Sequence, residues 1–213
     1  MNPTRLVSRS PLLYHMAHDG SWPSIRRHGL LSTSALLDLF GVVGPRREEI
    51  EANWRPVSVP IEHPVYGQAV IRDQLPLRPN ALARCLSNGM TPNEWYRTLN
   101  AHVFFWVDES HLETLLNARA YRDHPQTVMT LDTARLLERH LSSVRLSSIN
   151  SGSVLRGGAL RGLETFAPVV DFGKSRLVEL CVVGAVRDAE ELVVSVERRL
   201  PGGGRELLYR SPS

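Results

Sequence analysis

The sequence predicts one α+β domain over residues 1–213, with a mixed, mostly antiparallel central sheet and short peripheral helices. Three compact runs of β-branched and aromatic residues predict strands of one sheet, at residues 11–16, 102–107 and 176–186. Short helices are scattered irregularly between these runs, which favours an α+β fold over a doubly wound one. The length suits a single core, and neither an internal repeat nor a linker divides the chain.

Turn and cap residues define the first elements. After the first strand, Ser21, Pro23 and Gly29 predict a short helix with proline in its first turn and glycine after its last. A second short helix is expected at residues 35–40. Residues 41–64 are rich in proline, glycine and charge and lack periodicity, so they predict a long surface loop.

Strand and helix signals alternate in the middle of the chain. Residues 65–73 predict a strand that ends at an arginine and an aspartate. Thr91 and Glu94 form a capping box at the start of a helix. Asp108 is the expected N-cap of the helix that follows the run at 102–107. Residues 126–132 predict another strand, followed by another helix.

The last third of the chain changes character. Residues 149–162 are glycine-rich and aperiodic, which predicts a loop whose role the sequence does not define. Residues 176–186 predict a central strand. Residues 191–200 and 205–210 predict a terminal hairpin around a Pro-Gly-Gly-Gly turn.

Composition predicts a soluble, cytoplasmic protein with no membrane span. No segment reaches the length of about 20 apolar residues that a membrane helix needs, and the start of the chain does not resemble a signal peptide. Cys85 and Cys181 form no CxxC pair, which argues against a disulfide framework and a cysteine zinc site. Lys174 is the only lysine among 25 basic residues. Arginine suits phosphate partners, although a coding bias gives the same composition.

Several common site types are excluded by spacing. Residues 173–175, Gly-Lys-Ser, lack the glycine that a P-loop places five residues earlier, and no GxGxxG follows the first strand. Residues 151–153 lack the flanking glycines of a hydrolase elbow. His15 and His18 lie on a strand that runs into a loop, where two rings spaced by three residues diverge, so no metal site is expected.

Two polar residues stand out in apolar strands. His15 requires a hydrogen-bond partner, which a nearby backbone carbonyl would supply. Glu179 shares a strand face with Leu177 and Cys181. An ionised carboxylate on an apolar face needs local solvation, an arginine partner or a cleft.

Two blocks of sequence carry a resemblance to a known family. Residues 13–32, LYHMAHDGSWPSIRRHGLLS, and residues 175–192, SRLVELCVVGAVRDAEEL, resemble the ADP-ribosyltransferases that act on nucleic acids. These are the DarT-like DNA-modifying toxins and, more distantly, the tRNA 2′-phosphotransferases. The resemblance covers about the first 35 and last 40 residues, and the order of elements supports the rest.

The resemblance implies an ADP-ribosyltransferase-like fold with NAD as substrate and no metal. In those families a strand-borne histidine, a short helix and a His-Gly-Leu turn form one wall of the NAD pocket, and a strand glutamate faces it. Glu179 is therefore the expected catalytic residue. The expected NAD-contacting residues are Tyr14, His15, Ser32, Arg72 and Phe105. The aromatic run at 102–107 would equally serve as core.

The implied reaction is loss of nicotinamide from NAD and transfer of ADP-ribose to DNA or RNA, in a bacterial toxin or phage-defence effector that an antitoxin could control. A carboxylate such as Glu179 would stabilise the cationic ribosyl centre. Two alternatives stay open. One is a non-catalytic nucleic-acid- or protein-binding module, and the other is an NAD glycohydrolase with water as acceptor. An enzyme should direct His15 and Glu179 into one cleft.

Overall fold

The computed structural model describes residues 1–155 and 159–212. The strands of its main sheet are β1 (Leu12–His18), β5 (His102–Trp106), β6 (Gln126–Asp132), β7 (Val144–Ser147), β8 (Ala167–Pro168), β9 (Glu179–Val183), β11 (Val193–Arg199) and β12 (Arg205–Arg210). They lie in the order β12-β11-β6-β1-β5-β9-β7-β8. Two smaller ladders pair β2 (Leu30–Leu31) with β10 (Ala185–Val186), and β3 (Val59–His63) with β4 (Gly67–Ile71). Every ladder between these strands is antiparallel.

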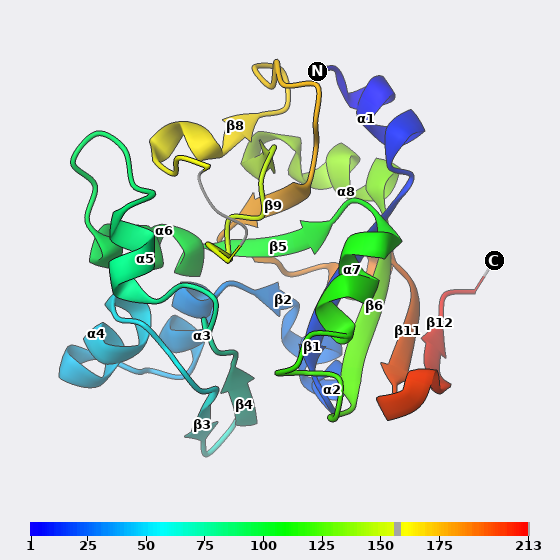
Figure 1. The fold of residues 1–213 in the computed structure, drawn as a ribbon. Coiled ribbons are helices and arrows are strands. Elements are labelled where there is room, and N and C mark those ends of the chain that lie inside the picture. The colour runs from blue at the N-terminus through cyan, green and yellow to red at the C-terminus, as the bar shows by residue number, and fades with distance from the viewer. Residues whose placement is uncertain (156–158, 213) are drawn as a thin grey trace.

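The main sheet changes direction between β1 and β5. β1 pairs with β6 along its whole length, whereas it pairs with β5 only where Tyr14 lies opposite Trp106. In Figure 1, β5 and β9 run roughly horizontally, whereas β1, β6 and β11 run roughly vertically. The sheet therefore consists of two halves joined at one residue pair, and this junction between β1 and β5 is the bend of the sheet.

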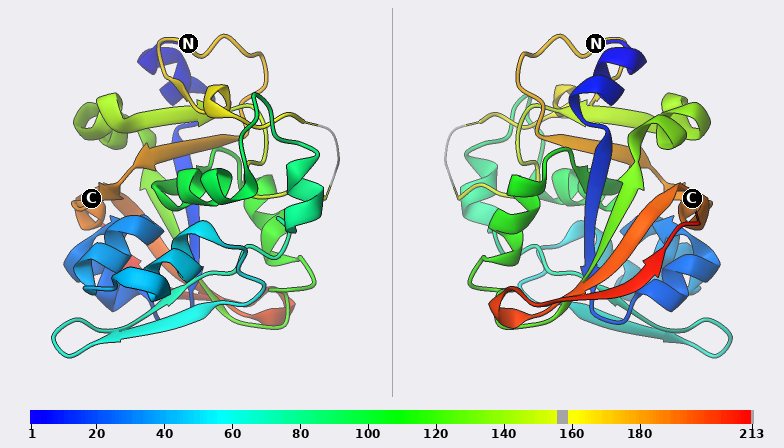
Figure 2. Two further views of the ribbon diagram at one scale, coloured as in Figure 1. Left: turned by 90° about the vertical axis from the view of Figure 1, so that its left-hand side faces the viewer. Right: turned by 90° about the vertical axis from the view of Figure 1, so that its right-hand side faces the viewer.

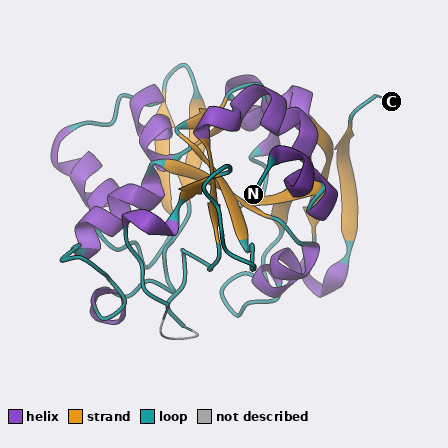
Figure 3. Ribbon diagram, turned by 90° about the horizontal axis from the view of Figure 1, so that it is seen from above, coloured by secondary structure: helices purple, strands orange, loops and turns teal. Residues whose placement is uncertain are grey.

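Short helices surround the two halves of the sheet (Figure 3). Their bounds are α1 (Pro3–Arg9), α2 (Trp22–His28), α3 (Thr33–Leu39), α4 (Gly44–Ala52), α5 (Pro79–Ala83), α6 (Pro92–Asn100), α7 (Glu109–Leu116), α8 (Thr133–His140) and α9 (Ala189–Leu192). Within the described residues, three single 3₁₀ turns cover Leu141–Ser143, Leu163–Thr165 and Pro201–Gly203. Figure 2 shows α3 to α6 and the β3–β4 hairpin gathered on one side of the molecule. No helix in the described part of the chain has the length and apolar character to cross a membrane.

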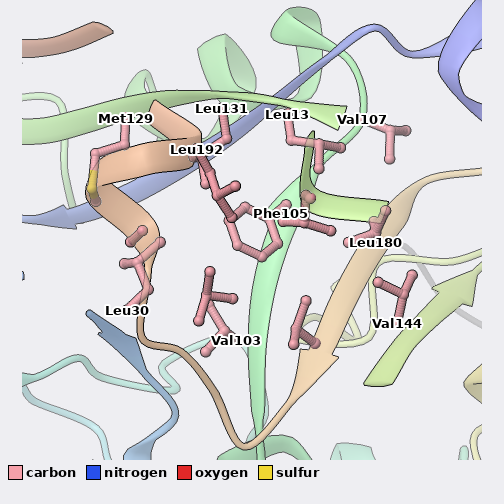
Figure 4. Packing of buried hydrophobic residues seen from close by; sticks show 14 of the residues in the cluster. Leu13, Leu30, Val103, Phe105, Val107, Met129, Leu131, Val144, Leu180 and Leu192 are labelled. Carbon is pink, nitrogen blue, oxygen red and sulfur yellow. The ribbon is translucent and has the colours of Figure 1, made fainter. Parts of the chain in front are cut away.

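The largest core cluster lies on one face of the central strands. Leu13, Phe105 and Leu180, from β1, β5 and β9, point into it and are almost fully buried (Figure 4). Fully burying a side chain of this size contributes about 1.5–3 kcal/mol. On the opposite face, Met16 and Val128 pack under Leu112 of α7. The sheet is thus covered on both faces around the bend.

The sequence predictions for the strands and caps are largely confirmed. The three runs expected in one sheet form the neighbouring strands β1, β5 and β9. The run at 176–186 is divided, because Gly184 has a φ of 79° and turns the chain so that β10 pairs with β2 instead. The capping box of Thr91 and Glu94 is present, and so is the Asp108 cap.

Gly29 ends α2 for a physical reason that the sequence pattern only suggests. Its φ is 84°, a region that side-chain-bearing residues rarely adopt. A Cβ at this position would lie 2.4 Å from Cα of Arg187. The close approach of the chain at Gly29 allows β2 to pair with β10.

The prediction of a long loop at residues 41–64 is wrong. This segment contains α4 and β3. The buried residues of α4 are Ile50, Glu51 and Ala52, which are consecutive. The helix therefore lacks the periodic apolar stripe by which a helix is predicted from sequence. An i,i+4 ion pair between Arg47 and Glu51 supports it instead. The loop expected at 149–162 contains no helix or strand in its described residues, whereas residues 156–158 lie outside the described part.

A buried arginine fastens α4 to its neighbours. Arg55 is 6% exposed. It donates to the carbonyls of Ile50 and Arg72 and, over 2.9 Å, to Oδ1 of Asn100 in α6. Asn100 in turn donates to the carbonyl of Glu51 over 2.7 Å. This network holds the end of β4, and with it Arg72, against the rest of the domain.

Substitution of Arg55 by leucine should lower the free energy of unfolding by about 3 kcal/mol, because three buried oxygen acceptors lose their donor. Urea denaturation monitored by far-UV circular dichroism measures the change. The matched control is Arg46→Leu, which removes only an exposed pair with Glu49 and should leave the midpoint nearly unchanged. Equal effects of the two substitutions would contradict the structural role of Arg55.

Candidate active site

One row of side chains crosses the bend on a single face of the sheet. Residues paired across antiparallel strands project to the same side. The register therefore aligns Thr130, Tyr14, Trp106, Glu179 and Ser147, from β6, β1, β5, β9 and β7. The row places the expected catalytic residue two strands from Tyr14, with the Trp106 indole between them.

Glu179 is a buried carboxylate at the start of β9. Only 4% of the residue is exposed. The backbone N–H of Ser151 donates to its Oε2 over 3.1 Å, and the Ser151 hydroxyl donates to the same oxygen over 2.7 Å. Among the described residues, both hydrogen bonds of the carboxylate end on Oε2. Oε1 accepts no hydrogen bond from residues 1–155 and 159–212.

Burial raises the pKa of Glu179 to about 7. The two hydrogen bonds from Ser151 and the positive charge of Arg161 oppose this rise, because both favour the ionised form. The carboxyl group therefore changes charge near neutral pH, which is typical of residues that exchange or stabilise charge during a reaction.

The loop that covers Glu179 is built around a buried arginine. Arg161 is 3% exposed, and its guanidinium donates to the carbonyls of Asn150, Ser153 and Ala159. These bonds tie the turn at residues 150–153 to the segment that returns from it. Sequence reasoning predicted a loop here but missed Arg161, which is one of two arginines in a glycine-rich segment and carries no distinguishing pattern.

His15 lies where β1 and β5 separate. Its Nδ1 donates to the carbonyl of Phe104 over 2.8 Å, and because a carbonyl only accepts, the proton is on Nδ1 and Nε2 is an acceptor. Burial lowers the pKa of His15 to about 4, so the ring is neutral at pH 7. The carbonyl partner predicted for His15 is therefore present. It belongs to β5, the strand from which β1 diverges.

Arg72 is brought close to His15 from the end of β4. Its charge contributes to the lowered pKa of His15, after burial. Nη1 of Arg72 donates to Oε1 of Gln126 over 2.7 Å, and its guanidinium lies 4.6 Å from the ring of Tyr121. The Tyr121 hydroxyl donates to Asp73 over 2.9 Å. Sequence reasoning found Arg72 but missed Gln126 and Tyr121, since neither stands in a recognisable pattern.

The other expected NAD contacts occupy different surroundings. Ser32 is buried and caps α3, with its hydroxyl accepting from the N–H of Ala35 over 3.2 Å. Phe105 is 1% exposed in the main core, with its ring 5.7 Å from that of His15. Tyr14 is half-buried, and burial together with the carboxylate of Glu109 raises its pKa.

The structure brings His15 and Glu179 to the same junction but on opposite faces of the sheet, so the two do not enter one cleft as the sequence led us to expect of an enzyme. Residue alternation sends Tyr14 to the Glu179 face, so His15 starts towards the opposite one, on which Phe105 lies. Two surface hollows, of about 450 and 230 Å³, contain neither His15 nor Glu179. The smaller lies between α7 and the sheet and includes Tyr14.

No group of three His, Cys, Asp or Glu side chains in residues 1–155 and 159–212 is arranged to hold a metal ion. His18, three residues after His15, is exposed, and its Nδ1 forms a hydrogen bond with the carbonyl of Asp19 over 2.8 Å.

Fold and site together define an α+β protein whose antiparallel sheet bends at a buried glutamate and a neutral histidine. Residues 11–194 match DUF7002, a family of unknown function, and the chain belongs to this family. The matched segment contains both His15 and Glu179. No curated protein matches the chain.

The raised pKa of Glu179 predicts a pH-dependent stability. A carboxyl group whose folded pKa exceeds its ordinary value of 4.5 stabilises the folded state at low pH, and this stabilisation is lost as the pH rises through about 7. Relative to Glu179→Gln, the wild type should lose about 3 kcal/mol of unfolding free energy between pH 4.5 and 7.5.

Urea denaturation of both proteins at a series of pH values measures this difference. The exposed Glu164→Gln variant is the control and should follow the wild type at every pH. Parallel profiles for Glu179→Gln and the wild type would show that the Glu179 carboxyl titrates normally.

Proposed function

We propose that this protein is an NAD-dependent ADP-ribosyltransferase that modifies nucleic acid. The observation that supports the proposal most directly is Glu179, a buried carboxylate at the sheet bend with one oxygen held by two donors from Ser151. The resemblance of residues 13–32 and 175–192 to nucleic-acid ADP-ribosyltransferases supplies the substrate class. It also suggests a toxin or phage-defence role with an antitoxin partner.

In the proposed reaction, the bond between the nicotinamide nitrogen and C1′ of its ribose breaks, and nicotinamide leaves with the electron pair. The ribosyl centre becomes cationic, so an ionised group fixed beside it stabilises the transition state more than the ground state. Glu179 fits this role, because Oε2 is held by Ser151 and Oε1 can accept a ribose hydroxyl. A nucleophilic atom of the nucleic acid then forms the new bond to C1′, and its proton is released to solvent.

The proposed reaction requires NAD to span the bend between β1 and β5, because His15 projects from the sheet face opposite Glu179. His15 and Arg72 would bind the remainder of NAD there. Neutral His15 has its proton on Nδ1, so its Nε2 can accept a hydrogen bond from a ribose hydroxyl. Arg72 carries a positive charge near the same histidine, and a guanidinium is suited to a diphosphate. Tyr14, Ser32 and Phe105 would then shape the walls, with Ser32 and Phe105 acting through the backbone and core that they support. No step requires a metal ion.

The wild-type protein should transfer label from NAD to DNA or RNA, and Glu179→Gln should lower the rate by about 10² to 10³ with little effect on NAD binding. The substitution keeps an acceptor for Ser151 but removes the charge. Incubation with labelled NAD and separate pools of DNA, RNA and protein identifies the acceptor. Glu164→Gln should keep the wild-type rate. Nicotinamide release without a labelled acceptor would indicate a glycohydrolase, and wild-type turnover in Glu179→Gln would remove Glu179 from the mechanism.

NAD should raise the melting temperature of both the wild type and Glu179→Gln, because His15 and Arg72, the residues proposed to bind the remainder of NAD, are unchanged. At a concentration of about 100 dissociation constants the stabilisation is about 2.7 kcal/mol. Differential scanning fluorimetry across a millimolar NAD series measures the shift, with ATP as the comparison ligand. No shift with NAD would favour the non-catalytic binding module.

A further inference from the structure

We propose that Ser151 is a positioning residue for ADP-ribosyl transfer, which holds Oε2 of Glu179 so that Oε1 faces the ribose. This inference rests on the function proposed above. Ser151 is 1% exposed, and both of its donors reach the same carboxylate oxygen, the N–H over 3.1 Å and the hydroxyl over 2.7 Å. Two donors from one rigid residue fix the plane of the carboxylate as well as its position.

The turn that carries Ser151 is held by bonds that do not involve Glu179. At the end of β7, the hydroxyl of Ser147 donates to the carbonyl of Ile149 over 3.0 Å and accepts from the N–H of Ile149 over 3.3 Å. Beyond the turn, Arg161 donates to the carbonyls of Asn150 and Ser153. The donors of Ser151 are therefore in place before the carboxylate ionises, which is the arrangement that makes electrostatic stabilisation effective.

Ser147 links this turn to the strand that bears Glu179. It lies directly opposite Glu179 in the β7–β9 ladder, is fully buried, and its carbonyl accepts from the N–H of Val178 over 2.9 Å. The turn and the strand that bears Glu179 are thus tied together next to the contact between Ser151 and Glu179.

The Ser151 hydroxyl bonds the ionised form of Glu179, so its removal should make ionisation harder. A hydrogen bond to a charged group is strong enough to move a pKa by about one unit. Ser151→Ala should therefore shift the pH profile of kcat upward by about one unit and lower kcat about fivefold at pH 7, with KM for NAD unchanged. Ser151→Thr keeps both donors and should keep the wild-type profile.

The matched control is Ser153→Ala in the same turn, because the Ser153 hydroxyl bonds the N–H of Leu155 and not the carboxylate. Its profile should equal that of the wild type. If Ser151→Ala does not fold, Ser151→Cys supplies a weaker donor of similar size and should shift the profile in the same direction. An unchanged profile in the folded Ser151 variant, with or without a lower melting temperature, overturns the proposal.

A second measurement does not depend on catalysis. In a double-mutant cycle of Ser151→Ala and Glu179→Gln, the coupling in unfolding free energy should be larger at pH 8, where the carboxylate is ionised, than at pH 5. If the wild type neither transfers ADP-ribose nor releases nicotinamide, the proposed function fails, and coupling in the cycle then assigns Ser151 a structural role only. If the wild type is active but the profiles coincide, only the role of Ser151 fails.

Discussion

The single residue pair between β1 and β5 is the constraint on which the site depends. Where Tyr14 lies opposite Trp106 the two halves of the sheet are still joined, and beyond that pair they diverge. Buried backbone carbonyls need a donor, and the imidazole of His15 supplies one to Phe104, two residues before Trp106 in β5. The same pair aligns Tyr14 and Trp106 with Glu179 on β9. The bend thus sets the tautomer of the histidine and brings the carboxylate to the junction.

His15 and Glu179 affect stability in opposite directions as the pH changes. Burial lowers the pKa of His15 to about 4, so the stability that it contributes is present at neutral pH and is lost as the pH falls below 6.5. Burial raises the pKa of Glu179 to about 7, so its contribution is lost as the pH rises from 4.5 to 7. Between about pH 4.5 and 6.5 the two effects offset each other. A flat stability profile of the wild type would therefore conceal two perturbed groups, which single substitutions reveal.

The sequence predicted elements that local chemistry determines. Thr91 and Glu94 predict the start of α6, because a capping box acts within one helical turn. The strands at the bend are predictable because they are dense in β-branched and aromatic residues. The sequence failed to predict α4, whose stability depends on Arg55 and on contacts distant in the chain. Glu179 and His15 were found because each is polar in an apolar strand. Ser151 could not be assigned to Glu179, because 28 residues separate the two and only the β7–β9 pairing brings them together.

Stability alone does not account for a carboxylate at position 179. A glutamine could accept the same bonds from Ser151 without the penalty of burying a negative charge. Arg161 reduces that penalty through its charge, yet its described hydrogen bonds go to backbone carbonyls of the covering loop and not to the carboxylate. The fold therefore carries a group that is less favourable at neutral pH than its neutral isostere, with a preformed pair of donors directed at it. Local departures from the most stable choice are expected where a structure serves a reaction, and Glu179 is a departure of the kind that its proposed catalytic role requires.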